Sequence, residues 1–187
     1  MNIVIFGPPG AGKGTQAKYL VKKLNSFQIS TGDMLRDEIN NNTEVGKKII
    51  NNMNEGKFVE DEIVNKLLEK IIFDTKKKNK LIFDGYPRTK NQAINLENLL
   101  SKSNQKINYI FFLNVNKDSI LKRIEKRKIL EKRMDDDANT IIKRYDTYME
   151  ITKPVLDFYS SRNNFYEIDG SEEIEVISSK IEEILVV

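Results

Sequence analysis

The stretch Gly7-Pro8-Pro9-Gly10-Ala11-Gly12-Lys13-Gly14-Thr15 follows the apolar run Ile3–Phe6 and precedes residues 16–24, whose apolar spacing predicts a helix. A strand, a glycine-rich loop and a helix in this order are typical of a phosphate-binding loop. The glycines allow successive backbone N–H groups to face one anion, and the helix adds the positive end of its dipole. Lys13 is placed to bridge terminal phosphates, and Thr15 can offer its hydroxyl toward Mg²⁺. The stretch therefore predicts nucleotide binding.

The phosphate-binding loop does not by itself specify a reaction. In the general motif a serine or threonine directly follows the lysine, whereas here Gly14 follows and Thr15 comes one position later. A GTPase switch, a motor, a transport ATPase and a kinase of small molecules all use such a loop. The reaction must be inferred from the rest of the chain.

The composition excludes several kinds of catalysis. The 187 residues include no cysteine and no histidine, so disulfide scaffolds, zinc sites built from these residues, and Ser-His-Asp or Cys-His chemistry are ruled out. A net charge of +3, spread along the chain, favours no nucleic-acid partner. No apolar stretch reaches membrane-spanning length, so we expect no membrane association and a cytoplasmic location.

Short apolar runs recur along the chain and alternate with segments of helical spacing. Besides Ile3–Phe6 they lie at residues 27–30, 81–84, 109–113 and 165–168. Runs without polar alternation are typical of strands buried on both faces. The pattern predicts an α/β fold of the P-loop type, with a parallel five-stranded sheet flanked by helices. The polar residues 31–59 predict a small helical insertion, and a long helical pattern begins near residue 135.

Two further segments should face the phosphate loop. Residues 30–36, STGDMLR, follow the second apolar run, and residues 84–89, DGYPRT, end the third. In a parallel sheet, ligands gather beyond the carboxyl ends of the strands. Arg36 and Arg88 suit bidentate contact with phosphate, and Asp84 stands where an acceptor for Mg²⁺-bound water is needed.

With these segments in view, the chain resembles the adenylate kinase family over essentially its whole length. GPPGAGKGT, STGDMLR, GKFV at residues 56–59, DGYPRTxxQA at residues 84–93 and a late arginine cluster occur in the family's order. Glycine and threonine after the lysine are the normal form in nucleoside monophosphate kinases. The resemblance implies a core of residues 1–29, 60–126 and 138–187, a monophosphate-binding insertion at 30–59, and a short lid at 127–137.

Arginine usage supports the resemblance. The chain prefers lysine, and six of its seven arginines fall where the family places arginines that contact phosphate or nucleotide. These are Arg36, Arg88, Arg123, Arg127, Arg133 and Arg144, whereas Arg162 is left over. A rigid guanidinium fork is worth keeping where a point charge does not serve.

The resemblance implies a role for each matching residue. The ATP side would comprise Gly10, Ala11, Gly12, Lys13, Gly14, Thr15, Arg123, Arg127 and Glu172. The AMP side would comprise Thr31, Arg36, Lys57, Phe58, Val59, Gly85, Tyr86, Pro87, Arg88, Gln92, Arg133 and Arg144. The catalytic cations would be Lys13, Arg88, Arg127, Arg133 and Arg144. Mg²⁺ would be held through nucleotide and water, with Thr15 and Asp84 nearby and no direct protein ligand.

The implied activity is reversible, Mg²⁺-dependent phosphoryl transfer from ATP to AMP by a monomer. Thr31 and Gln92 favour AMP, because the uridylate/cytidylate kinases of this family typically carry alanine and asparagine there. Such a UMP/CMP kinase and a non-catalytic nucleotide-binding protein remain the alternatives. A regulatory GTPase fits less well, because residues 114–118, NVNKD, do not match its base-reading motif. The lid lacks the glycines that short-lid relatives carry near Lys128 and Lys132, so we expect a stiffer, partly helical flap.

Overall fold

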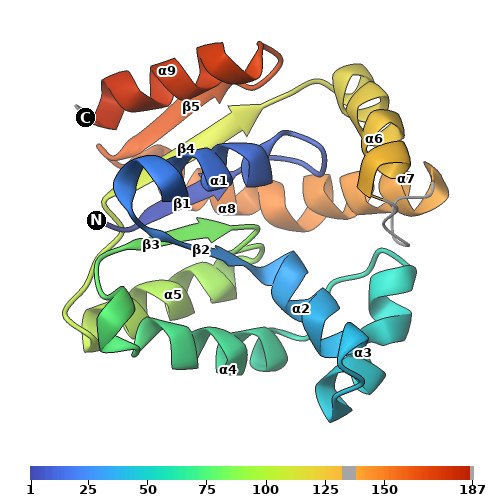
Figure 1. Ribbon diagram of the computed structural model, residues 1–187, viewed down its shortest axis with the longest axis horizontal. Coiled ribbons are helices and arrows are strands. Elements are labelled where there is room, and N and C mark those ends of the chain that lie inside the picture. The colour runs from blue at the N-terminus through green and yellow to red at the C-terminus, as the bar shows by residue number, and fades with distance from the viewer. Residues whose placement is uncertain (132–137, 186–187) are drawn as a thin grey trace.

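A computed structural model describes residues 1–131 and 138–185 (Figure 1). Over these residues five parallel strands form one sheet in the order β2-β3-β1-β4-β5. The strands are β1 (Ile3–Phe6), β2 (Phe27–Ser30), β3 (Leu81–Asp84), β4 (Tyr109–Asn114) and β5 (Phe165–Asp169). The expected α/β class and parallel sheet are confirmed, and each strand matches a predicted apolar run to within one residue.

Helices connect the strands. They are α1 (Lys13–Leu24), α2 (Thr31–Asn40), α3 (Glu44–Asn54), α4 (Asp61–Ile72), α5 (Lys90–Lys102), α6 (Lys117–Glu131), α7 (Ala138–Thr147), α8 (Lys153–Ser160) and α9 (Ile174–Leu185), with a short 3₁₀ turn at Thr75–Lys77 and a π-helical turn at Tyr148–Thr152. None of the helices within the described ranges combines the length and the apolar character needed to cross a membrane.

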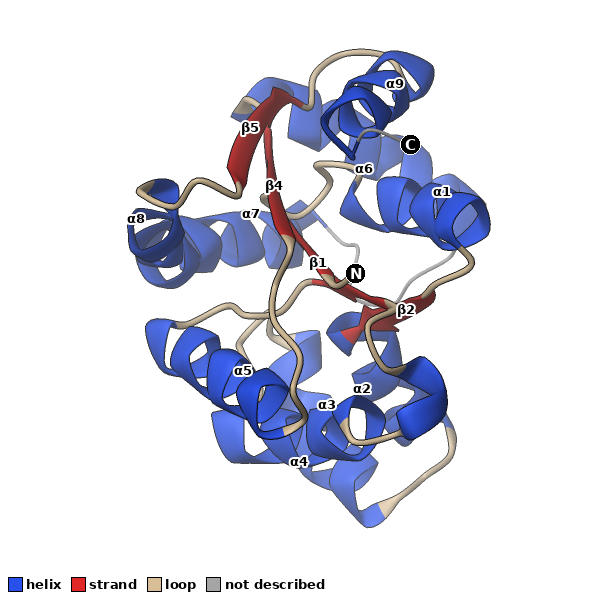
Figure 2. Ribbon diagram, turned by 90° about the vertical axis from the view of Figure 1, so that its left-hand side faces the viewer, coloured by secondary structure: helices blue, strands red, loops and turns tan. Residues whose placement is uncertain are grey.

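The sheet lies between two layers of helices, and an apolar core fills each side (Figures 1 and 2). On one side Val4 of β1 belongs to a core that includes Leu68 of α4, and on the other Ile5 joins Leu20 of α1 and Ile181 of α9. Successive side chains of a strand point to opposite faces, so a sheet covered on both faces needs strands that are apolar throughout. This requirement explains why the strands could be recognised from the sequence.

Parallel pairing brings the carboxyl ends of β2, β3 and β1 to one edge of the sheet. Ser30 of β2 pairs with Asp84 of β3, and Asp84 pairs with Ile5 of β1. The segments that follow these strands, which include the phosphate loop, the start of α2 and Gly85, therefore leave the sheet side by side. The register places the predicted site motifs together, as ligand sites in such sheets require.

The residues between β2 and α4 form the helices α2 and α3, which stand beside the sheet (Figure 1). They pack closely at Gly46, where an added Cβ would lie 2.1 Å from the backbone oxygen of Glu38. The far end of α3 reaches α7, because Thr140 Oγ1 donates to the backbone oxygen of Asn54 over 3.3 Å. The predicted helical character of this segment is confirmed.

The long helical pattern predicted near the C-terminal third is interrupted. α7 ends at Thr147, the π-helical turn follows, and α8 begins at Lys153 with Pro154 in its first turn. Proline lacks an N–H group, and its ring clashes with the carbonyl oxygen four residues earlier, so a regular α-helix cannot run through it. The wider turn accommodates the proline, a local adjustment that apolar spacing does not report.

Candidate nucleotide-binding cleft

The phosphate loop takes a backbone conformation that requires glycine. Gly10 has φ 82° and Gly12 has φ 93°, both in the left-handed region that side chains disfavour. A Cβ at Gly10 would also lie 3.0 Å from Ile124 Cδ1, so the loop packs directly on α6. Gly12 is the N-cap of α1, and the positive end of this helix therefore points into the loop. The loop therefore has the left-handed glycines and the adjoining helix N-terminus on which the predicted phosphate binding depends.

Lys13 folds back over the loop that precedes it. Its Nζ donates to the backbone oxygens of Gly7, over 2.8 Å, and Pro8, over 3.0 Å. The backbone N–H of Ala11 donates to the Pro8 oxygen over 3.1 Å and closes the loop. The ammonium group is thus held beside the N–H groups that would contact phosphate.

Asp84 provides a buried carboxylate beside the phosphate loop. Gln28 Nε2 donates to Asp84 Oδ2 over 3.0 Å, and a Cβ at Gly14 would lie 3.3 Å from the same oxygen. Burial raises the pKa of the Asp84 carboxyl, and the positive charge of Lys13 partly offsets this effect. Thr15, which follows Gly14 in the first turn of α1, has an exposed side chain.

This arrangement fits an Mg²⁺ ion held mainly by phosphate and water. Within the described residues there is no cluster of three or more acidic side chains that could enclose a metal ion. Mg²⁺ commonly keeps several waters and takes only one or two carboxylates from a protein. A single buried carboxylate, Asp84, next to a phosphate loop meets that requirement.

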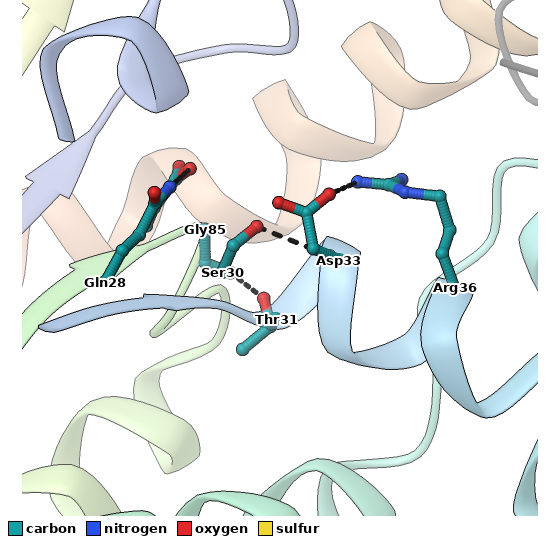
Figure 3. A network of polar contacts seen from close by, with 7 residues as sticks. Gln28, Ser30, Thr31, Asp33, Arg36 and Gly85 are labelled. Atoms are coloured by element: carbon teal, nitrogen blue, oxygen red, sulfur yellow. Dashed lines mark hydrogen bonds and ion pairs between the residues drawn. The ribbon is translucent and has the colours of Figure 1, made fainter. Parts of the chain in front are cut away.

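The start of α2 brings a second group of polar side chains to the same edge (Figure 3). Ser30 caps the helix by accepting a hydrogen bond from the N–H of Asp33 over 3.3 Å. Thr31 Oγ1 donates to the backbone oxygen of Gly85 over 2.8 Å, which joins the segments after β2 and β3. Arg36 forms an ion pair with Asp33 at 2.6 Å, one helical turn away. The Ser30 cap therefore fixes where α2 begins, and with it the positions of Asp33 and Arg36.

The segment after β3 is held by a dense set of hydrogen bonds. Arg88 Nε donates to the Gly85 oxygen over 2.8 Å, and the guanidinium lies 5.1 Å from the centre of the Phe58 ring. The N–H of Arg88 donates to Gln92 Oε1 over 2.7 Å. Thr89 caps α5 by accepting a hydrogen bond from the N–H of Gln92 over 3.1 Å. Arg88 and Gln92 are therefore positioned from the same short loop.

Cationic side chains from separate elements line one cleft of roughly 700 Å³, open solvent included. They are Lys13, Arg36, Lys57, Arg88 and Arg144. α7 approaches the insertion here, because a Cβ at Gly56 would lie 3.1 Å from Arg144 Cγ. Positive charges that face the same cleft repel one another, and a bound anion would relieve this repulsion. The cleft is therefore suited to a polyanionic ligand. The structure thus brings together residues that are far apart in the chain.

A smaller pocket opens beside this cleft and is largely apolar. Its lining comprises Thr31, Leu35, Phe58, Val59, Val64, Gly85, Tyr86, Arg88 and Gln92. Apart from Leu35 and Val64, these residues were predicted for the AMP side. A largely apolar pocket whose lining also includes the polar residues Thr31, Tyr86, Arg88 and Gln92 suits a planar heterocyclic base.

Arg123 lies on the other side of the phosphate loop. Its guanidinium donates to the backbone oxygens of Gly170, over 2.7 Å, Glu172, over 3.4 Å, and Ala11, over 3.5 Å. These bonds join α6, the loop after β5 and the phosphate loop. Residues 169–172, which include the predicted ATP-side residue Glu172, therefore lie next to Arg123.

Part of the predicted site falls outside the description. Arg133 and residues 132–137 of the expected lid lie outside the described residues. The backbone of Arg127 belongs to α6, and its side chain is likewise outside the description.

Sequence reasoning missed residues that support the site from behind. Asp61 accepts hydrogen bonds from Gln92 and Thr89, and Gln28 orients Asp84. An acidic residue in the first turn of a helix is common for electrostatic reasons alone, so Asp61 carried no distinct signal. Gln28 belongs to an otherwise apolar strand, and its polar side chain was the signal that could have identified it from the sequence.

The parallel sheet, the glycine loop with its lysine and the cationic cleft together define an α/β phosphate-loop protein that binds nucleotides. The family model for adenylate kinase matches residues 5–164 of the chain. The chain is 50% identical to an adenylate kinase of Pelagibacter ubique over 99% of both chains. It is 40% identical to one of Mycoplasma mycoides over 92% of both, and 38% identical to one of Caulobacter over 97% of this chain and 96% of the relative. The chain belongs to the adenylate kinase family.

Proposed function

We propose that this protein transfers the terminal phosphoryl group of ATP to AMP, giving two ADP, by holding both nucleotides head to head in the cationic cleft. The single observation that carries the proposal is the convergence of Lys13, Arg36, Lys57, Arg88 and Arg144 on that cleft. Two nucleotides bring several negative charges to one place, and these cations would neutralise them.

On the proposed ATP side, the N–H groups of residues 10–15 surround the phosphates and Lys13 contacts the transferred group. Arg123, held by three carbonyl oxygens, presents its flat guanidinium to the adenine beside residues 169–172. We assign Arg127 to the ATP phosphates from the family resemblance.

On the proposed AMP side, Arg36 and Arg88 bind the monophosphate and the smaller pocket takes the base. Phe58, Val59 and Tyr86 provide its apolar walls, and Thr31 and Gln92 its polar groups. Arg144 stands between the two sides, and we assign Arg133 the same bridging role from the resemblance.

The reaction needs no general base, because the acceptor is already an anion. A phosphate oxygen of AMP attacks the γ-phosphorus of ATP, and the bond from that phosphorus to the bridging oxygen of ADP breaks. The chain's contribution is to align the two phosphates and to neutralise charge through Lys13 and the arginines. Mg²⁺, when bound, would neutralise further charge on the phosphates, with Asp84 accepting hydrogen bonds from its waters.

We further propose the division into a core, an insertion at residues 30–59 and a short lid at 127–137. α2 and α3 stand beside the sheet, which supports treating them as a part that closes over AMP. The alignment with the Pelagibacter protein extends over 211 positions although this chain has 187 residues, whereas the Caulobacter alignment extends over 182. The two alignments therefore differ in length, and we place the difference in the lid. Closure would exclude water, which competes with AMP as acceptor.

The test is an acceptor panel. The purified protein is incubated with ATP, Mg²⁺ and one of AMP, CMP, UMP or GMP, and ADP is measured by a coupled assay. We expect AMP to be the preferred acceptor by at least about tenfold. Preference for CMP or UMP would support the UMP/CMP kinase. If none of the four acceptors is phosphorylated, the proposal is contradicted. Light scattering after size-exclusion chromatography tests the expected monomer.

A further inference from the structure

Asp61, the first residue of α4, uses both carboxylate oxygens to hold groups at the edge of the smaller pocket. Gln92 Nε2 donates to its Oδ1 over 2.6 Å, and Thr89 Oγ1 donates to its Oδ2 over 3.0 Å. Asp61 does not itself line that pocket, whereas Gln92 does and is 3% exposed. The carboxylate therefore lies behind the amide that faces the base.

Two bonds determine which way round the Gln92 amide lies. An ionised carboxylate can only accept hydrogen bonds, so the nitrogen of the amide must face Asp61. A backbone N–H can only donate, so the oxygen of the amide must face the N–H of Arg88, at 2.7 Å. Turning the amide by 180° would place oxygen against carboxylate and N–H against N–H. The orientation is thus set from two sides.

The fixed amide retains one donor and one acceptor position for a ligand. Nε2 has a second hydrogen and Oε1 a second lone pair. Adenine presents a ring-nitrogen acceptor next to an amino donor, which complements this pair. A 6-oxopurine such as hypoxanthine presents a ring N–H next to a carbonyl oxygen, the opposite order. It would leave buried groups unpaired, which is how polar sites reject a near-identical ligand.

We propose that Asp61 is a positioning residue that makes the site select a 6-aminopurine monophosphate over a 6-oxopurine monophosphate, by locking the Gln92 amide. The inference rests on the proposed function, because it assumes that the smaller pocket binds the acceptor base. The lock does not separate adenine from cytosine, whose edge has the same order of groups; the shape of the pocket makes that distinction.

The experiment compares AMP and inosine monophosphate, which differ only in this edge of the base, as acceptors for the wild type and Asp61→Asn. Asparagine keeps the shape and can still accept from Gln92, but its amide can also donate to a reversed Gln92. We expect the AMP/IMP ratio of kcat/KM to fall by at least about tenfold, mainly through a lower KM for IMP. A split between KM and kcat separates positioning of the base from general damage.

The matched control is Glu62→Gln, which removes a carboxylate from the next position of the same helix. Glu62 is exposed and pairs with Lys66 at 2.7 Å, so its substitution should leave the ratio unchanged. Asp61→Ala removes the carboxylate without adding a donor, and it should lower the ratio while also raising the KM for AMP. Thermal unfolding of each variant confirms that the folded protein is compared.

The outcomes are distinct. If the wild type does not phosphorylate AMP, the proposed function fails. If it prefers AMP to IMP, and the ratio of folded Asp61→Asn or Asp61→Ala stays within about twofold of wild type, the role of Asp61 is overturned while the function stands. A wild type that uses IMP as well as AMP also overturns the lock.

Discussion

The proposed ATP side of the cleft is made largely by the backbone of one contiguous loop, whereas the proposed AMP side is made by side chains from several segments. Gly10 and Gly12 take conformations that put N–H groups in place locally. The AMP side depends on contacts between the start of α2, the loop after β3 and α5, such as the bond from Thr31 to Gly85. Substitutions on the two sides should therefore have different effects on the KM for ATP, the KM for AMP and stability.

The largest effect is expected from Arg88→Ala on the AMP side. Loss of the guanidinium removes a positive charge that we assign to the AMP phosphate, the group that attacks ATP, and kcat should fall by about a thousandfold. Steady-state kinetics with saturating ATP and AMP measures this. Arg162→Ala is the control, because that arginine pairs with Glu97 and packs on Phe158 and Tyr159, outside the cleft lining. Nearly unchanged turnover in folded Arg88→Ala would contradict the assigned cleft.

Gly12→Ala tests the backbone of the ATP side. Apart from Gly12 and its two neighbours in the chain, no heavy atom lies within 4 Å of the added Cβ, so the cost comes from φ 93° and not from a clash. We expect about 1–2 kcal/mol less stability in urea and a KM for ATP raised by about tenfold, with the KM for AMP little changed. Asn104→Ala, at φ 53° far along the chain, should lower stability without changing either KM. An equal rise in both KM values would remove the distinction between the sides.

Thr31→Ala tests the side-chain construction of the AMP side. The hydroxyl joins α2 to Gly85, and its loss should raise the KM for AMP by roughly fivefold, about 1 kcal/mol, while the KM for ATP stays near wild type. Thr31→Ser keeps the hydroxyl and should restore the wild-type value. If serine fails to restore it, the methyl group and not the hydrogen bond would be responsible.

Asp84→Asn should change the melting temperature only slightly, and the sign of this change tests the direction of the Asp84 pKa shift. Burial raises the pKa of Asp84 above its ordinary value of 3.8, so the folded state holds the proton more tightly than the unfolded state. The stability of the wild type therefore falls as the pH rises from about 3.8 through the higher pKa of the folded state. Asparagine does not titrate, so at pH 7.5 the variant should melt at a higher temperature than wild type, although its Mg²⁺-dependent turnover is lower. The difference in melting temperature should shrink at pH 4. A larger difference at pH 4 would contradict the direction of the shift.

Much of the architecture could be predicted because each signal was local. β1 and β3 are apolar on both faces, so continuous runs marked them. The π-helical turn before Pro154 was missed, since helical spacing continues across it and the interruption depends on how the chain widens. In α4, Val64, Leu68 and Ile72 are buried, whereas Ile63, Leu67 and Ile71, each one residue earlier, are half-buried, a difference that apolar spacing alone does not reveal.

By itself the sequence determined the phosphate loop, the parallel sheet and the family, because left-handed glycines and doubly buried strands leave a pattern in adjacent residues. The tertiary structure alone decided that Asp61 stands behind Gln92, 31 positions further along the chain, and that Arg144 meets Gly56 at the cleft. The reason is physical. A backbone conformation depends on its immediate neighbours, whereas the partner of a side chain depends on how separate helices pack against the sheet.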